Sequence, residues 1–228
     1  MNTKSFHLIA AALFVSIIAG RGQGTFVNMD FESPVLPLIA PLGTFRVAIT
    51  NALPHWAAYI DDVPQDRVVF NTIALDNAAI SLHDSRSIYG PAPQGNYSVY
   101  LQPSSPFASQ QASAALAQTG MVPQDARSLL LYAKPSTFPF LTLQVTFAGQ
   151  TISMMPVGAA TATYQVWGGD ISPHSGQSGE LRFTVTPHAA SWLDNIQFSS
   201  DPVPEPGTWA LFGLGSALLC CVARRKRK

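Results

Sequence analysis

Short apolar runs, each ended by a turn-forming residue, constrain this 228-residue chain more than any other feature of its sequence. Eighteen prolines and sixteen glycines punctuate the chain, and most of its middle lacks a helical period. In the run Leu141–Phe147, apolar side chains occupy every second position, as a strand with one buried face requires. The sequence therefore predicts a protein built from many short strands.

About ten short strands with frequent turns are typical of a β-sandwich. The fold class predicted for residues 25–202 is therefore all-β, a single jelly-roll β-sandwich with no second domain boundary. Ser109–Gln118 is the one stretch that looks helical, and its alanines fit an edge strand equally well. The runs predicted as strands are Phe45–Ile49, Arg67–Asn71, Ala79–Leu82, Tyr97–Leu101, Ser128–Ala133, Leu141–Phe147, Thr151–Met155, Tyr164–Trp167, Glu180–Val185 and Trp192–Phe198.

The charge distribution and the cysteines exclude several classes of function. Residues 25–203 contain six Lys or Arg and twelve Asp or Glu, a net charge of −6. Such a body repels phosphate backbones, so no nucleic-acid partner is expected. The two cysteines, Cys220 and Cys221, lie in an apolar run near the C-terminus. The body therefore has no disulfide framework, thiol nucleophile or zinc-thiolate site.

The first 24 residues have the three-part layout of a secretory signal peptide. Lys4 precedes an apolar run from Phe6 to Ala19, and small or polar residues follow from Gly20 to Gly24. The run is short for a bilayer span and shows no amphipathic period of a buried helix. We expect residues 1–24 to direct the chain to the export machinery and to be cleaved between Gly20 and Thr25. The absence of cysteine there excludes a lipoprotein anchor.

The C-terminus combines three features in a fixed order. An uncharged run at 207–223 is long enough for a short transmembrane helix of about 25 Å. Basic residues prefer the cytoplasmic side, so the tail is predicted inside and the body outside the membrane. The motif before the run is Val203, Pro204, Glu205 and Pro206, and the basic membrane stop after it is Arg224, Arg225, Lys226, Arg227 and Lys228.

Residues 203–228 resemble the PEP-CTERM sorting signal of Gram-negative bacteria, which joins a Pro-Glu-Pro motif, an apolar helix and an arginine-rich end. The resemblance implies recognition by an exosortase, a membrane-embedded cysteine transpeptidase that cuts near the motif. Such proteins are commonly tied to exopolysaccharide or biofilm matrix. This chain departs from the pattern in Lys226 and Lys228 and in the cysteine pair that closes the apolar run. A membrane anchor that is never processed is the alternative.

The body also resembles galactose-binding-like jelly rolls, as found in carbohydrate-binding modules. The residues that carry this resemblance are Asn28-Met29-Asp30-Phe31-Glu32-Ser33-Pro34, Leu53-Pro54-His55-Trp56, Gly149-Gln150 and Leu193-Asp194-Asn195-Ile196. In similar domains, positions matching Glu32 and Asp194 ligate a structural Ca²⁺, which takes oxygen ligands. The two residues lie near opposite ends of the domain, and first and last strands are often neighbours. The alternative is a solvated Glu32 and an Asp194 that hydrogen-bonds a turn.

Exposed aromatic side chains could stack on sugar rings, although most aromatics in a β-sandwich fill its core. Trp56 follows a proline in a predicted loop and Trp167 precedes two glycines, so these two are the best candidates to face solvent. Asp61 and Asp62, just after Trp56, could present acceptors to sugar hydroxyls or belong to a solvated loop. Trp56, Trp167, Asp61 and Asp62 are therefore the candidate carbohydrate-binding residues.

The search for catalytic residues returns only weak candidates. A glycosidase needs two facing carboxylates, and only Glu180 with Asp170 or Glu32 with Asp194 would qualify. The histidines stand apart without a metal-ligating spacing, and glycine loops for phosphate are absent. No catalytic residues are therefore nominated, no cofactor is required, and the chain is predicted not to be an enzyme.

The sequence as a whole indicates an exported protein of the cell envelope or extracellular matrix. Its expected partners are the export machinery, an exosortase, the inner membrane before processing and an extracellular polysaccharide. One alternative is a purely structural surface protein, which would bury all its aromatics. The other is a secreted glycan-active enzyme.

Overall fold

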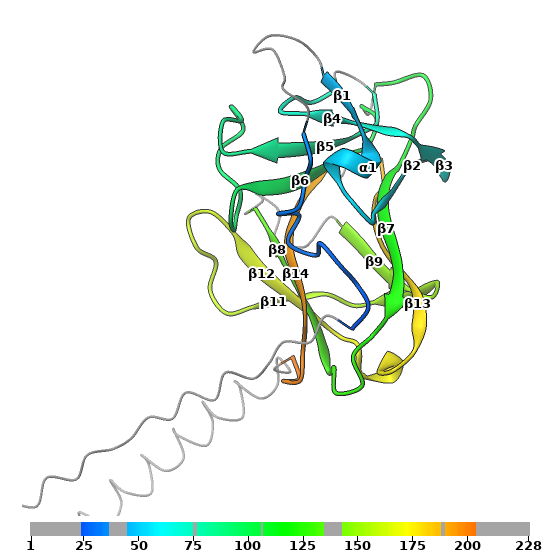
Figure 1. The fold of residues 1–228 in the computed structure, drawn as a ribbon, viewed down its shortest axis with the longest axis vertical. Coiled ribbons are helices and arrows are strands. Elements are labelled where there is room, and N and C mark those ends of the chain that lie inside the picture. The colour runs from blue at the N-terminus through cyan, green and yellow to red at the C-terminus, as the bar shows by residue number, and fades with distance from the viewer. Residues whose placement is uncertain are drawn as a thin grey trace, which may run out of the picture.

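A computed structural model describes residues 24–36, 45–74, 77–105, 107–134, 143–187 and 190–203. Two β-sheets pack face to face, as Figure 1 shows, and the prediction of an all-β sandwich is confirmed. The predicted signal peptide and the tail from Pro204 onward lie outside the described residues. Among the residues described, no helix has the length and apolar character needed to cross a bilayer.

The larger sheet has eight strands in the order β1-β4-β5-β6-β14-β8-β12-β11. All its pairings are antiparallel except that between β4 and β5. Its strands are β1 (Phe45–Ala48), β4 (Arg67–Phe70), β5 (Ala79–Asp84), β6 (Tyr97–Gln102), β8 (Ser128–Ala133), β11 (Met155–Val157), β12 (Gln165–Asp170) and β14 (Ser191–Ser199).

The smaller sheet has six strands in the order β10-β9-β13-β7-β2-β3, all antiparallel. Its strands are β2 (Ala57–Ile60), β3 (Val63–Gln65), β7 (Ala114–Met121), β9 (Leu143–Phe147), β10 (Gln150–Ile152) and β13 (Ser178–Val185). A helical turn, α1 (Ile49–Ala52), and a 3₁₀ turn, η1 (Ser172–His174), complete the described elements.

The chain often changes sheet between successive strands, as expected of a jelly roll. From β6 to β9 each successive strand joins the opposite sheet, and β12, β13 and β14 repeat the pattern. The run Thr151–Met155, predicted as one strand, is divided between the two sheets. Its first part joins β10 and its last residue begins β11, with Ser153 and Met154 crossing between the sheets. β2 and β3 were not predicted as strands.

The alanine-rich stretch is neither a helix nor an edge strand. It forms β7, which lies between β13 and β2 in the smaller sheet. Strand alternation is hard to see there because Ala115 and Ala117, on the outward side, are as buried as Leu116 on the core side. The Arg182 guanidinium lies 4.7 Å from the centre of the Tyr59 ring, and these residues belong to the two strands that flank β7. Only small side chains, such as those of Ala115 and Ala117, fit on β7 beneath the contact between Tyr59 and Arg182.

A segment without regular structure, residues 24–36, packs Phe26, Met29 and Phe31 into the core. It is the blue trace at the front of Figure 1. The Gln118 side chain holds this segment through both backbone polar groups of one residue, Val27. Its Oε1 accepts from Val27 N at 2.8 Å, and its Nε2 donates to Val27 O at 2.9 Å. A buried glutamine amide thus replaces a strand partner.

We expect Gln118→Ala to lower the free energy of unfolding by about 1–3 kcal/mol, because the Val27 backbone loses two part-buried hydrogen bonds. Urea unfolding of the purified protein measures the change. The matched control is Gln144→Ala on β9, where the side chain is exposed, and it should unfold like wild type. Equal losses in the two variants would show that Gln118 does not anchor the segment.

Candidate functional site

The prediction that Trp56 faces solvent is wrong. Its side chain is 5% exposed and packs against the rings of Phe31 and Phe183, with centroids 5.4 and 6.1 Å away. The indole Nε1 donates to Asn28 O at 2.8 Å, and the Asn28 amide in turn donates to Pro54 O at 3.2 Å. The residues that resemble a carbohydrate-binding module here hold the N-terminal segment to the core.

Trp167 is buried as well, with 8% of its surface exposed. It pairs with Leu131 of β8 on the core side of the larger sheet, which explains why the prediction of exposure fails. It does line a pocket of about 370 Å³ between β9, β10 and β11. The other lining residues are mostly apolar and include Ile152, Met154 and Met155.

Asp61 and Asp62 form the two-residue turn between β2 and β3. Both have positive φ, 46° and 61°, as a hairpin turn of this length requires. The Asp61 carboxylate accepts Ser113 N at 2.7 Å, and the Asp62 carboxylate pairs with Arg182. These contacts show that Asp61 and Asp62 shape and hold the turn. Neither residue lines the pocket beside Trp167.

Aromatic side chains collect on the outward face of the larger sheet instead. Val99, Leu101, Leu193 and Leu131 point into the core, so strand alternation places the residues between them on the opposite face. All of these outward aromatics are half-buried, unlike the fully buried core aromatics. We call them the aromatic face, defined by Tyr100 on β6, Trp192 on β14, Tyr132 on β8 and Tyr164 just before β12.

The aromatic face consists of two ring pairs. Tyr100 and Trp192 have centroids 4.8 Å apart, and Tyr132 and Tyr164 stack nearly parallel at 4.3 Å and 3°. Lys134 lies beside the first pair, with its Nζ 3.6 Å from the centre of the Trp192 ring. The sequence offers a weak signal for this face, because Tyr100, Trp192 and Tyr132 each stand between two buried residues.

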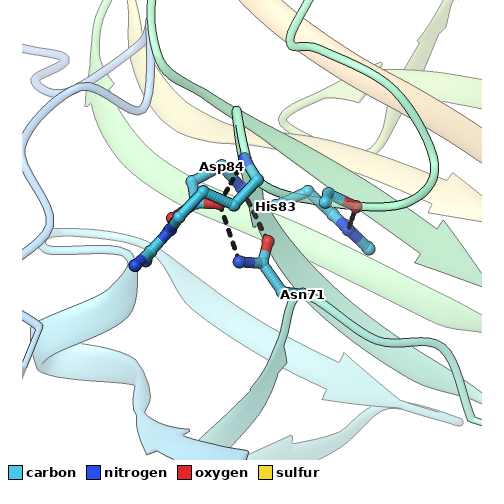
Figure 2. A network of polar contacts seen from close by, with 5 residues as sticks. Asn71, His83 and Asp84 are labelled. Atoms are coloured by element: carbon cyan, nitrogen blue, oxygen red, sulfur yellow. Dashed lines mark hydrogen bonds and ion pairs between the residues drawn. The ribbon is translucent and has the colours of Figure 1, made fainter. Parts of the chain in front are cut away.

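One loop, residues 85–96 between β5 and β6, is tied down beside the aromatic face. Lys134 Nζ donates to Tyr89 O at 3.0 Å, and His83 Nδ1 lies 2.7 Å from Ser87 Oγ. Figure 2 shows the neighbouring contacts of β5, where Asp84 accepts from the Asn71 amide at 2.7 Å. Despite burial, which raises it, hydrogen bonds from Arg86 and Asn71 hold the pKa of Asp84 below its usual value.

His83 is 1% exposed and stands against the rings of Tyr89, Tyr100 and Trp192. Burial, with the nearby Lys134 charge, lowers the pKa of His83 to about 4, and Asp84 opposes the drop only weakly. Its Nε2 is buried and has no hydrogen-bond partner among the described residues. The fold therefore holds a neutral imidazole.

Glu32 and Asp194 converge on the same loop, each accepting backbone amides from it. Glu32 Oε1 accepts from Asn96 N at 2.7 Å and from Tyr97 N at 2.8 Å, while Asp194 Oδ2 accepts from Gln94 N at 2.8 Å. Burial raises the pKa of the Asp194 carboxyl to about 8. Gly95 has φ +63°, and an added Cβ would lie 2.4 Å from Glu32 Oε1.

These contacts form a loop clamp, and the calcium centre at Glu32 and Asp194 stays a prediction. The carboxylate oxygens already face N–H donors, and the described residues contain no group of three or more acidic, histidine or cysteine ligands. The other carboxylate pair named as a catalytic candidate is also engaged locally. Asp170 accepts Ser172 N at 2.9 Å, and Glu180 lies 3.9 Å from Arg182.

The first site prediction concerns pH. The pKa of His83 is about 4 when folded and about 6.5 when unfolded. The stability contributed by the neutral imidazole is therefore complete above pH 6.5 and is lost as the pH falls toward 4. The loss should reach at most about 3 kcal/mol. Urea unfolding between pH 7 and 4 should show a steeper decline for wild type than for His83→Gln, and parallel curves would contradict the assignment.

The second site prediction concerns the clamp. Glu32→Ala should lower the free energy of unfolding by about 1–3 kcal/mol, because the amides of Asn96 and Tyr97 lose their acceptor. Glu180→Ala, at a partly exposed carboxylate, is the control and should cost little.

Wild-type melts in calcium and in chelator separate the clamp from a metal bridge. Because amides already occupy the carboxylate oxygens, we expect the two melts to superimpose. A bound ion at hundredfold excess over its Kd would add about 2.7 kcal/mol. A rise of several degrees in calcium would therefore establish the bridge between Glu32 and Asp194.

Comparison with solved structures gives distant likenesses. The enzymatically active domain of tailspike protein 4 of bacteriophage CBA120 is 16% identical over 64% of this chain, with a TM-score of 0.37. This chain spans 19% of that domain's length. The family 11 carbohydrate-binding module from Clostridium thermocellum, in complex with a β-1,3-1,4-mixed-linked tetrasaccharide, is 8% identical. That match covers 72% of this chain and 100% of the module, with a TM-score of 0.35.

No curated protein matches the sequence of this chain. One family model does match, that of the PEP-CTERM protein-sorting motif, over residues 202–228. The matched residues begin where the described body ends, and they include the Pro-Glu-Pro motif, the apolar run and the basic end. The chain therefore carries a PEP-CTERM sorting motif, which marks it as an exported protein processed by an exosortase.

Proposed function

We propose that this chain is an exported protein of the cell envelope or extracellular matrix that binds an extracellular polysaccharide through the aromatic face. The single observation that carries the proposal is the placement of four half-buried aromatic rings on the outward side of the larger sheet. The sandwich core is filled without them by the inward residues of both sheets. A fold that needed aromatics only for stability would gain more by burying them.

The arrangement suits a chain of sugars. The four aromatics lie on or next to four adjacent strands, β6, β14, β8 and β12, which together span about 14 Å. An aromatic ring offers a flat apolar surface to the C–H face of a pyranose, and the Tyr hydroxyl provides a polar tip. Lys134 adds a cationic group beside the first pair. An extended oligosaccharide could contact both pairs at once.

The sorting tail supports the cellular part of the proposal. We infer that the exosortase cuts close to Val203-Pro204-Glu205-Pro206, because prolines keep a segment extended and accessible to a transpeptidase. The uncharged run at 207–223 would set its depth in the membrane, and the basic end would hold the tail in the cytoplasm. The export machinery and the exosortase are then the first partners, and the polysaccharide is the final one.

Binding without catalysis is favoured over the two alternatives. A purely structural surface protein would have no use for an outward aromatic face. A glycosidase needs two carboxylates that face one substrate. Asp170 instead caps the turn at Ser172, and Glu180 lies beside Arg182 on the other sheet.

The test is affinity electrophoresis of the purified protein in gels containing extracellular polysaccharide from the native cells. Replacing both Tyr132 and Tyr164 by Ala should weaken retardation about tenfold, or about 1.4 kcal/mol. Tyr59→Ala is the matched control, because Tyr59 is a half-buried tyrosine in the smaller sheet. Unfolding midpoints confirm that each variant is folded.

Equal retardation of wild type and the double variant would remove the aromatic face as the binding site. A loss of retardation in Tyr59→Ala alone would move the site to the smaller sheet. If wild type is not retarded by any polysaccharide fraction, the structural alternative holds.

A further inference from the structure

The folded body extends to the first residue of the sorting motif. Residues 199–203, which start with the last residue of β14, continue along the end of the sandwich, and we call them the C-terminal strap. Arg127 N donates to Ser199 O at 2.8 Å, and Ser128 Oγ donates to Asp201 O at 2.7 Å. The strap is therefore held by the turn that precedes β8.

Val203, the last residue of the strap, is half-buried against β12. A Cβ added to Gly168 would lie 3.1 Å from Val203 Cγ2 and 3.0 Å from Leu130 Cδ2. The outward side of β12 thus needs a glycine to leave room for the strap. Packing of the body consequently continues to the residue directly before Pro204.

The sequence leaves very little chain between this packing and the membrane. Only residues 204–206 separate Val203 from the uncharged run, and three extended residues span at most about 11 Å. The end of the sandwich beside the strap must then lie close to the bilayer while the tail is in place. A membrane-embedded transpeptidase has to bind extended chain within this gap.

We propose that the exosortase processes the chain only after the strap has been released from the body, so that strap opening limits the rate of processing. This rests on the sorting part of the proposed function. Local opening of a terminal segment costs much less than global unfolding. Release of residues 199–203 would more than double the extended chain available to the enzyme and leave the core strands of the sandwich in place.

Two variants test whether strap opening limits the rate of processing. The first inserts Gly-Ser-Gly-Ser-Gly-Ser between Val203 and Pro204, which supplies extended chain without disturbing the strap. The second, Ser128→Ala, removes the hydroxyl that donates to Asp201 O. Pulse-chase labelling in the native cells, with intact mass to identify the cut product, gives the processing rate. Each variant should be processed several-fold faster than wild type, and Ser128→Ala should add nothing when the spacer is present.

The matched control is Ser175→Ala. Its hydroxyl also donates to a backbone carbonyl, Ala126 O, at the same end of the sandwich, but it does not contact the strap. It should be processed at the wild-type rate. Acceleration in this control would point to general loosening of the fold.

Unchanged processing rates in the spacer and Ser128→Ala variants would overturn the proposal. Slower processing of the spacer variant would overturn it too, because it would show that the enzyme docks on the folded end of the sandwich. Failure of the sorting assignment gives a different result. In that case, wild type and the variant with Pro204, Glu205 and Pro206 changed to Ala would both keep Arg224 to Lys228 in their intact mass.

Discussion

The backbone amides of one loop depend on acceptors from distant parts of the chain. Residues 94–97 donate to Glu32, from the N-terminal segment, and to Asp194, from the last strand. Lys134 and His83 hold the earlier part of the same loop. These contacts join the first and last segments of the body, so the sandwich closes and the loop lies fixed beside Trp192. The position of the aromatic face follows from this clamp.

The two faces of one strand explain which aromatics are available for binding. On β14, Leu193 is fully buried and its neighbour Trp192 is half-buried, because successive side chains point to opposite sides. Trp167 has the opposite orientation on β12 and points to the core. Nearby prolines and glycines are therefore a poor guide to whether an aromatic is exposed in a sandwich. What decides exposure is whether the residue occupies an inward or an outward position of its strand. Which positions of a strand point inward is set by its pairing with strands that are distant in sequence.

Much of the fold could be predicted from local sequence, and most of the site could not. Runs with clear alternation are found where the pattern places them, as for β9 (Leu143–Phe147), which lies within the predicted run Leu141–Phe147. The sequence left β7 open between a brief helix and an edge strand, because its alanines are buried on both sides, beneath a contact between Tyr59 and Arg182 that only the folded sheet creates. Glu32 and Asp194 both accept from backbone amides of residues 94–97, and these amides carry no side-chain signal in the sequence.

The sorting tail and the aromatic face are connected through a single strand. β14 begins at Ser191, next to Trp192, and ends at Ser199, and the matched sorting motif begins at residue 202. Trp192 and Ser199 are seven positions apart, which is about 23 Å of extended chain. In the proposed function, the strap end of the sandwich faces the bilayer while the tail is in the membrane, and the Tyr100–Trp192 pair lies at the far end of β14. A polysaccharide could then reach that pair before the chain is processed.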